Sequence, residues 1–182
     1  ALDFLGIRYR ETQMCEADDW IAGYAHRYGG HADVVIASQD SDFFQLITDR
    51  VHVLRYRGDH STLCDPAYIR AKLGIEPQRY ASYKSLTGDT SDNIRGVDKI
   101  GPKTAAALMN QFRDVEDRIA RAPEIEKPSV RVSVISSTYR IRRNYALIAL
   151  SGEADLPFAI EDLAYTYTGI TTTQVLEGIG LR

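Results

Sequence analysis

The sequence predicts an α/β fold with an all-helical section at its C-terminal end. Residues 1–65 contain short runs of β-branched and aromatic residues between helical segments, which is the pattern of an α/β core. From Pro66 onward, apolar residues recur at helical spacing between helix-starting and helix-ending residues. The chain has 182 residues, of which 44% are hydrophobic, so it is large enough for one globular domain with a small helical appendage.

In the α/β part, two apolar runs identify the main strands. The run from Asp33 to Ser38 is short and continuous, which is typical of a strand buried on both faces of a parallel sheet. The run from Val51 to Tyr56 is rich in β-branched and aromatic residues, which favours a second strand. The other expected elements are the end of a helix over residues 3–7, short strands over 9–12 and 61–64, a helix over 17–28 and a helical turn over 42–47.

The helical part begins with a strong helix-start signal. Asp65 is a good N-cap, Pro66 suits the first helical position, and Gly74 marks the end of the helix. Residues 127–150 are expected to be mostly helical, although their β-branched residues leave a strand as an alternative. The other expected helices cover residues 77–86, 102–112, 115–122 and 171–177.

Residues 88–109 combine two kinds of chemistry. Asp89 and Asp92 lie three residues apart in a polar, turn-prone segment, as metal-binding carboxylates often do. Gly96 and Gly101 then bracket a short hairpin that opens an alanine-rich helix. Because glycine has no Cβ, backbone N–H groups in such a hairpin can approach a phosphate closely, and the helix N-terminus adds the positive end of its dipole. The segment therefore predicts a cation site beside a phosphate-binding hairpin.

Three acidic clusters are candidates for metal ligands, and each also has an ordinary structural explanation. The first lies at the start of a helix, where carboxylates cap the helix and complement its dipole. The second follows the strand over 33–38, at the edge where open α/β sheets bind ligands, but it could equally form an Asx turn. The third lies in a loop that could simply be solvated. The members are Glu16, Asp18, Asp19, Asp40, Asp42, Asp89 and Asp92.

Considered together, the clusters favour metal binding. Seven converging carboxylates would repel one another unless divalent cations neutralised them. Mg²⁺ prefers oxygen ligands and keeps several waters, and two such ions can bind the attacking and leaving oxygens of a phosphodiester displacement. His26, His31, His52 and His60 are scattered, so zinc is not indicated. We therefore expect two or more Mg²⁺ ions, with Mn²⁺ as a substitute.

The overall composition bounds the class of protein without naming its partner. No apolar run is long enough to span a membrane. Cys15 and Cys64 lack the spacing of a zinc site or a disulfide framework, which fits a cytoplasmic protein. The net charge of −3 argues against nucleic acid as a partner. However, the chain without the seven clustered carboxylates is net positive, and its basic residues are concentrated between residues 113 and 143, Arg118 among them.

Three segments resemble the 5′-nucleases, the family that includes the 5′–3′ exonuclease domain of bacterial DNA polymerase I and the flap endonucleases. They are Glu-Ala-Asp-Asp at 16–19, Ser-Gln-Asp-Ser-Asp-Phe-Phe-Gln-Leu at 38–46, and Gly-Asp-Thr-Ser-Asp-Asn-Ile-Arg-Gly-Val-Asp-Lys-Ile-Gly-Pro-Lys-Thr-Ala at 88–105. Their order and spacing match the family over residues 5–115, and the third segment is the most specific. The resemblance implies a PIN-like parallel-sheet nuclease core over residues 1–65, a helix-hairpin-helix DNA-binding module over 66–125, and a C-terminal helical segment over 126–182 that packs back on the core.

The resemblance also implies a role for each matched residue. Glu16 and Asp18 would bind a first metal ion with Asp19 beside them. The carboxylates of the second cluster and Asp92 would serve a second ion, and Asp89 would support that site. The hairpin residues would hold the backbone of duplex DNA, with K⁺ as a candidate ion there. These residues are Gly96, Val97, Ile100, Gly101, Lys103 and Thr104.

The implied activity is that of a Mg²⁺-dependent, structure-specific 5′-nuclease of replication and repair. Its substrate would be double-stranded or branched DNA with a 5′ end or flap. The protein would be a monomer in the cytoplasm, associated with the nucleoid if bacterial. The family pattern begins with a strand ending in a metal-site aspartate, then a second aspartate and a basic helical arch, none of which precedes Glu16 here. We therefore expect the chain to begin partway through a longer protein, with an incomplete nuclease core.

Two other functions stay open at this point. The hairpin alone would support a non-catalytic DNA-binding module. Alternatively, Asp40 and Asp42 after a strand are similar to the site of aspartate-nucleophile phosphatases, in which the first aspartate attacks phosphorus. That interpretation places Phe44 where those enzymes have Thr or Val, and it leaves the glycine hairpin without a role.

Overall fold

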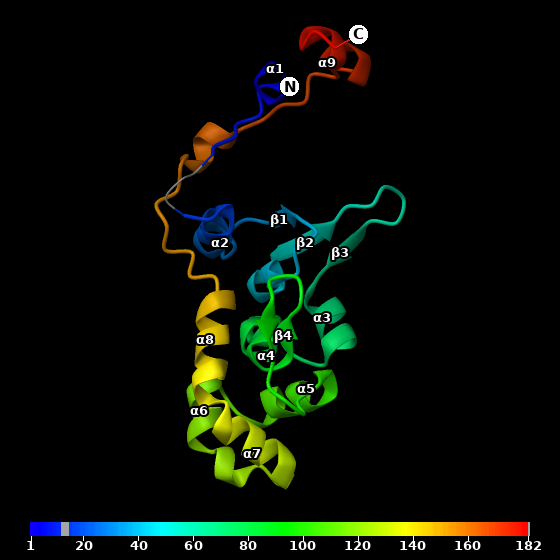
Figure 1. Ribbon diagram of the computed structural model, residues 1–182. Coiled ribbons are helices and arrows are strands. Elements are labelled where there is room, and N and C mark those ends of the chain that lie inside the picture. The colour runs from blue at the N-terminus through cyan, green and yellow to red at the C-terminus, as the bar shows by residue number, and fades with distance from the viewer. Residues whose placement is uncertain (12–14, 182) are drawn as a thin grey trace.

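The computed structural model of the protein describes residues 1–11 and 15–181 (Figure 1). A small sheet with α2 beside it lies in the middle, most of the helices lie at one end, and α1 and α9 lie together at the other end with the two termini. The helices are α1 (Leu2–Leu5), α2 (Ala17–Tyr28), α3 (Pro66–Leu73), α4 (Tyr80–Thr87), α5 (Pro102–Gln111), α6 (Val115–Ala120), α7 (Pro128–Ser136), α8 (Thr138–Ile148) and α9 (Thr172–Gly178), with 3₁₀ turns η1 (Asp42–Leu46), η2 (Pro77–Arg79), η3 (Ala122–Glu124) and η4 (Ile160–Leu163). The strands are β1 (Val34–Ala37), β2 (Val51–Arg55), β3 (Thr62–Cys64), β4 (Gly88–Asp89) and β5 (Ile94–Arg95).

The main sheet has the order β1-β2-β3. β1 runs parallel to β2, with Val34 opposite Val51, and β2 runs antiparallel to β3. Ile36 is buried, but Val35, on the other side of the pleat, is 56% exposed. The prediction that this strand is buried on both faces is therefore wrong. The reason is that, within the described residues, the core packs against one face of β1 only.

Helix α4 is the centre of the helical section. It packs against both α5 and α8, and its Leu86 lies fully buried with Met109 of α5 and Ile141 of α8. Residues 127–150 form helices α7 and α8, so the predicted helix is confirmed and the strand alternative is not adopted. The helices pack because each presents one apolar stripe to the same core.

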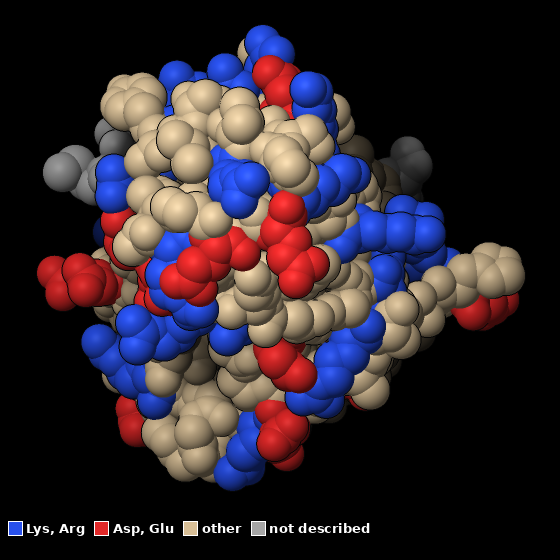
Figure 2. Space-filling view, turned by 90° about the horizontal axis from the view of Figure 1, so that it is seen from below, with Lys and Arg blue, Asp and Glu red and all other residues tan. Residues whose placement is uncertain are grey.

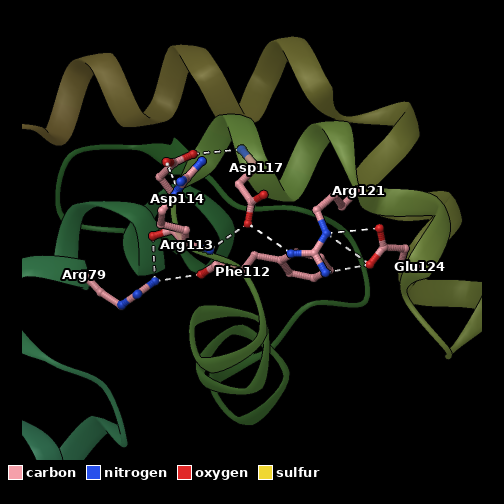
Figure 3. A network of polar contacts seen from close by, with 7 residues as sticks. All are labelled: Arg79, Phe112, Arg113, Asp114, Asp117, Arg121 and Glu124. Carbon is pink, nitrogen blue, oxygen red and sulfur yellow. Dashed lines mark hydrogen bonds and ion pairs between the residues drawn. The ribbon is translucent and has the colours of Figure 1, made fainter.

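Polar contacts fix the junction between α5 and α6 (Figure 3). Arg79 reaches across from η2 and donates from one nitrogen to the carbonyl oxygens of Phe112 and Arg113, both at 2.7 Å. Asp114 caps α6 by accepting from the Asp117 N–H, and Asp117 in turn accepts from the Arg113 N–H, each at 2.8 Å. Side chains thus form hydrogen bonds with the backbone carbonyl groups that follow α5 and with the backbone N–H groups at the start of α6. These bonds fix the orientation of α5 relative to the other helices.

The C-terminal part leaves the helical section after α8. It passes α2, where the Tyr24 hydroxyl donates to the Phe158 carbonyl oxygen at 2.8 Å and accepts from its N–H at 3.2 Å. It then reaches α9, which contacts α1 (Figure 1). Residues 9–11 form no strand, contrary to prediction, and residue 12 of that predicted strand lies outside the described residues. None of the described helices has both the length and the apolar content needed to cross a bilayer.

Candidate metal centre and nucleic-acid interface

The first acidic cluster starts α2, and its members have different surroundings. Glu16 is the N-cap, and it and Asp19 form a reciprocal capping box in which the Asp19 side chain accepts from the Glu16 N–H at 3.3 Å. The structural explanation therefore holds for these two residues. Asp18 is half-buried and faces other acids: burial raises its pKa, and Asp40, Glu16, Asp19 and Asp92 raise it further.

The second cluster forms the Asx turn that was one of its two expected explanations. The Asp42 N–H donates to Asp40 Oδ1 at 2.8 Å, which starts the 3₁₀ turn η1. Asp42 itself is half-buried. Its Oδ1 is buried and accepts no hydrogen bond from the described residues. Burial, followed by the charges of Asp40 and Asp89, raises the pKa of Asp42 to about 6.

The third cluster is carried by the small hairpin β4–β5. Asp89 is buried on β4, where its Oδ2 pairs with Lys84 Nζ at 2.5 Å and its Oδ1 accepts from the Ser91 N–H at 2.9 Å and from the Ser91 hydroxyl. Burial alone would raise the pKa of Asp89, but the hydrogen bonds from Lys84 and Ser91 outweigh it and the net shift is downward. Both oxygens of Asp89 are therefore already engaged, which suits a supporting role better than that of a ligand.

Asp92 connects the three clusters. It is exposed at the turn of the hairpin, and its charge raises the pKa of both Asp18 and Asp42. Segments 16–19, 40–42 and 89–92, distant in the chain, thus act on one another at one place. In the described residues, however, no three Asp, Glu, His or Cys side chains converge closely enough to form a ready metal cluster. The donor set still fits a hard cation, because it consists of carboxylate oxygens and includes the orphaned Oδ1 of Asp42.

Two residues at this site were not singled out in the sequence. Lys84, in the last turn of α4, forms an ion pair with Asp89. Its charge also lowers the pKa of Asp42, although burial and the neighbouring acids raise that pKa by more. Tyr80 is buried nearby: its pKa is raised by burial first, and the charges of Asp42 and Asp89 add to this while Ser41 opposes it. A lysine five residues before an acid carries no visible signal, since the pairing depends on how α4 meets β4.

The glycine hairpin differs in detail from the expected phosphate-binding turn. A Cβ on Gly96 would collide with the backbone carbonyls of Leu86 and Thr87. The absence of a side chain at Gly96 therefore lets the chain pass against the end of α4, and a contact of the Gly96 backbone with a phosphate stays a prediction. Lys99, at φ 66°, is the residue that adopts the left-handed conformation in this turn. Val97 and Ile100 are buried side chains, which leaves only their backbone for contact with a partner.

The start of α5 is the exposed part of the hairpin. Gly101 is the N-cap, with open space where a Cβ would be, and Pro102 occupies the first helical position. Lys103 is exposed and Thr104 is half-buried in the first turn. Both line a groove of about 490 Å³ that extends to Lys127, just before α7. A cation and free N–H groups at a helix N-terminus can bind an anion.

Surface charge alone does not delimit this interface. Figure 2 shows the end of the molecule seen from below, where Lys and Arg side chains are interspersed with Asp and Glu. In the helical section, ion pairs such as Arg142 with Glu116 and Arg121 with Glu124 also offset part of the positive charge. The hairpin and the carboxylates therefore define the candidate site more clearly than net charge does.

Comparison with known proteins places these features in a family. The model of the 5′–3′ exonuclease N-terminal resolvase-like domain matches residues 1–74, and that of the 5′–3′ exonuclease C-terminal SAM fold matches residues 75–169. The chain belongs to the 5′–3′ exonuclease family. The two models meet after residue 74, whereas the sequence predicted a boundary after residue 65, and the predicted domain limits stay a prediction.

Curated relatives in this family are DNA polymerases. The chain is 39% identical over 160 residues to DNA polymerase I of Treponema pallidum, an alignment that covers 87% of the chain and 16% of the relative. It is 33% identical over 161 residues to the thermostable DNA polymerase I of Thermus aquaticus, covering 88% of the chain and 19% of the relative. The chain thus spans less than a fifth of the length of these relatives.

Solved structures agree on the fold. T5 5′-exonuclease with bound divalent metal ions (zinc) superposes with a TM-score of 0.66 at 28% identity, over 76% of the chain and 51% of the T5 protein. A bacteriophage T5 flap endonuclease in a complex with DNA and metal ions gives a TM-score of 0.65 at 27% identity, over 76% of the chain and 51% of that protein. The catalytic core of Rad2 with DNA substrate, at 16% identity and a TM-score of 0.59, shares the fold over 97% of the chain and 60% of its own. The predicted α/β core followed by a helical module is confirmed.

Proposed function

We propose that the chain hydrolyses phosphodiester bonds in duplex or branched DNA with a 5′ end or flap, in a Mg²⁺-dependent reaction. The observation that carries the proposal is that the charge of Asp92 raises the pKa of both Asp18 and Asp42, so that acids from three separate segments lie at one place. This place lies next to the hairpin that begins α5, because β5 leads directly into it. Because the chain belongs to the 5′–3′ exonuclease family, we interpret these acids as ligands for the metal ions of a nuclease.

In this proposal, separate groups of residues bind the metal ions, support the metal site and hold the DNA. Asp18, Asp42 and Asp92, with Glu16, Asp19 and Asp40 around them, supply the oxygens for divalent ions. Lys84 holds Asp89, which braces the hairpin that carries Asp92. When bound, the ions activate the attacking water and neutralise charge that develops on the phosphate. The N-terminus of α5 with Gly101, Lys103 and Thr104 holds a phosphate of the duplex, with K⁺ as a candidate ion at the hairpin, and the buried side chains of Val97 and Ile100 shape its backbone.

The proposal is tested with a nicked duplex and a 5′-flap duplex, each labelled at the 5′ end. We expect the protein, as a monomer, to release short labelled products in the presence of Mg²⁺, with Mn²⁺ as a substitute, and none in EDTA. Para-nitrophenyl phosphate serves as a control substrate. Binding of the duplexes without any Mg²⁺-dependent product would favour the non-catalytic DNA-binding module. Hydrolysis of the monoester but not of DNA would favour the phosphatase, which the family match disfavours.

A change at the hairpin tests the phosphate contact separately. Lys103→Ala should weaken duplex binding to a similar degree for any sequence, because phosphate contacts carry no base information. It should also reduce the slope of log K against log salt concentration by about one unit. Fluorescence anisotropy at several salt concentrations in EDTA measures both quantities.

The control for this change is Arg57→Ala. Arg57 is exposed in the β2–β3 loop, which projects away from α5 (Figure 1), so its loss should leave the slope unchanged. A slope that falls equally in both variants would mean that net charge, and not the hairpin, determines binding.

A further inference from the structure

Helix α8 contacts Arg95 and Gly96, which we call the joint. The joint connects the hairpin β4–β5, which carries Asp89 and Asp92, to the glycine hairpin over residues 96–101, the proposed DNA-binding hairpin. Asn144 is fully buried, and its Nδ2 donates to the Arg95 carbonyl oxygen at 2.9 Å and to the Ser85 carbonyl oxygen at 3.1 Å. One turn earlier on the same face of α8, Arg140 donates from Nη1 to the Gly96 carbonyl oxygen at 3.3 Å. α8 therefore binds two successive carbonyl groups from more than 40 residues away in the chain.

The joint itself has little freedom to move. Arg95 ends β5, which pairs with the strand that carries Asp89, and Gly96 begins the turn that leads to α5. From the other side, the Val97 N–H donates to the Leu86 carbonyl oxygen of α4 at 2.7 Å. Gly96 also lies so close to the end of α4 that a Cβ there would collide with backbone. The joint is thus held between α4 and α8, with side chains of α8 satisfying its carbonyl groups.

We propose that Arg140 and Asn144 are positioning residues that fix the DNA-binding hairpin relative to the metal-binding carboxylates and so select which phosphodiester is cut. This inference rests on the proposed nuclease function. Successive phosphates of one strand are separated by about 3.4 Å along the duplex axis, so a small shift of the hairpin brings a neighbouring phosphate to the carboxylates. A misplacement of about 1 Å already lowers the rate of a reaction that depends on orientation.

The first experiment compares two arginines of α8. Arg140→Gln removes the contact with Gly96, whereas Arg143→Gln removes the same charge from an exposed position on the same helix. On a 5′-labelled flap duplex, we expect Arg140→Gln to spread the cut over neighbouring phosphodiesters and to lower the single-turnover rate constant about tenfold. Arg143→Gln should give the wild-type product, and Arg140→Lys, which keeps a donor, should restore most of the single cut. Equal product patterns for Arg140→Gln and Arg143→Gln would overturn the proposal.

The second experiment uses Asn144→Ala and a readout that does not need cleavage. Native-state hydrogen exchange should be faster at the Val97 amide in Asn144→Ala and in Arg140→Gln, and unchanged in Arg143→Gln, while circular dichroism reports whether each variant is folded. Asn144→Ala should lower the rate constant about 10²-fold with duplex affinity within about threefold of wild type. Unchanged exchange at Val97 in the folded Arg140→Gln variant would overturn the inference. If the wild-type protein cuts nothing, the proposed function fails, and the exchange experiment still decides whether α8 holds the joint.

Discussion

Asp42→Asn should abolish Mg²⁺-dependent cleavage and at the same time stabilise the metal-free protein. The loss of cleavage follows because a bound ion contributes several kcal/mol to the stability of the transition state, so the loss of a ligand lowers the rate by about 10³-fold. The gain in stability follows because the ionised Asp42 is half-buried among other acids, with an oxygen that accepts no hydrogen bond from the described residues. Asparagine has the same shape and no charge.

The sign of the stability effect follows from the pKa of Asp42. Its value of about 6 in the folded protein lies above its ordinary value of 3.8. Between these values the folded protein binds a proton that the unfolded chain does not, so the wild-type protein gains stability as the pH falls through 6 and loses it as the pH rises. The full shift corresponds to about 3 kcal/mol, and the partial exposure of Asp42 reduces this to about 1–2 kcal/mol.

The measurement is thermal or urea unfolding in EDTA at pH 7.5 and pH 5. Asp42→Asn should raise the melting temperature at pH 7.5 by about 3–6 °C and show a smaller difference at pH 5. Asp92→Asn should also abolish cleavage, but it should leave stability nearly unchanged because Asp92 is exposed. Asp59→Asn, in the exposed β2–β3 loop, is the control for both effects. Normal turnover in Asp42→Asn or Asp92→Asn would contradict the metal site.

The local elements were predictable because their signals are local. Asp65 caps α3 by accepting from the Tyr68 N–H at 2.7 Å, as the Asp-Pro pair predicted, and the apolar runs over 33–38 and 51–56 contain β1 and β2. The acidic segments could also be found, since their residue types and spacing are visible in the sequence. Their grouping is supported by the effect of Asp92 on Asp18 and Asp42, although these acids do not form a closed cluster in the described residues.

What could not be predicted depends on contacts between distant elements. Lys84 pairs with Asp89 because α4 ends against β4, and Asn144 binds Arg95 because α8 crosses α4. Gly96 has the composition of a phosphate-binding turn, but its neighbour in space is the end of α4. The exposure of Val35 was missed for a similar reason, since an apolar run does not reveal which face of the strand is covered.

The burial of Arg118 could not be predicted from the sequence either, because a charged residue is expected at the surface. It belongs to the basic C-terminal half of the sequence, but it is fully buried on α6 and contributes nothing to a surface for DNA. Its Nε and Nη1 have no hydrogen-bond partner in the described part of the chain, and Nη2 reaches only Met109 Sδ at 4.0 Å. Burial lowers the pKa of Arg118 to about 10, with Arg79 adding to this and Asp114 opposing it.

Replacing this arginine with an apolar residue of similar length should therefore stabilise the protein. Because the pKa is lower in the folded state, the charged guanidinium disfavours folding in full at every pH below about 10, and this cost falls as the pH rises above 10 toward the ordinary pKa of arginine. The lowered pKa corresponds to about 3 kcal/mol. Buried charged groups replaced by well-packed apolar ones have yielded gains of about 1–4 kcal/mol. We expect Arg118→Met to raise the free energy of unfolding by about 1–3 kcal/mol at pH 7, since its thioether would lie beside Met109.

Urea unfolding of three variants distinguishes this charge effect from packing. Arg118→Ala should lose most of the gain or become less stable than wild type, because it leaves a cavity in the core. Arg121→Met, at an arginine that pairs with Glu124 at 2.7 Å on the surface, should change stability by less than about 1 kcal/mol. The advantage of Arg118→Met should shrink between pH 9 and pH 11 as the wild-type guanidinium loses its proton in the folded state. If Arg118→Met were as destabilised as Arg118→Ala, the guanidinium would have stabilising partners in the folded protein. The charge at this buried position of α6 would then be needed for stability.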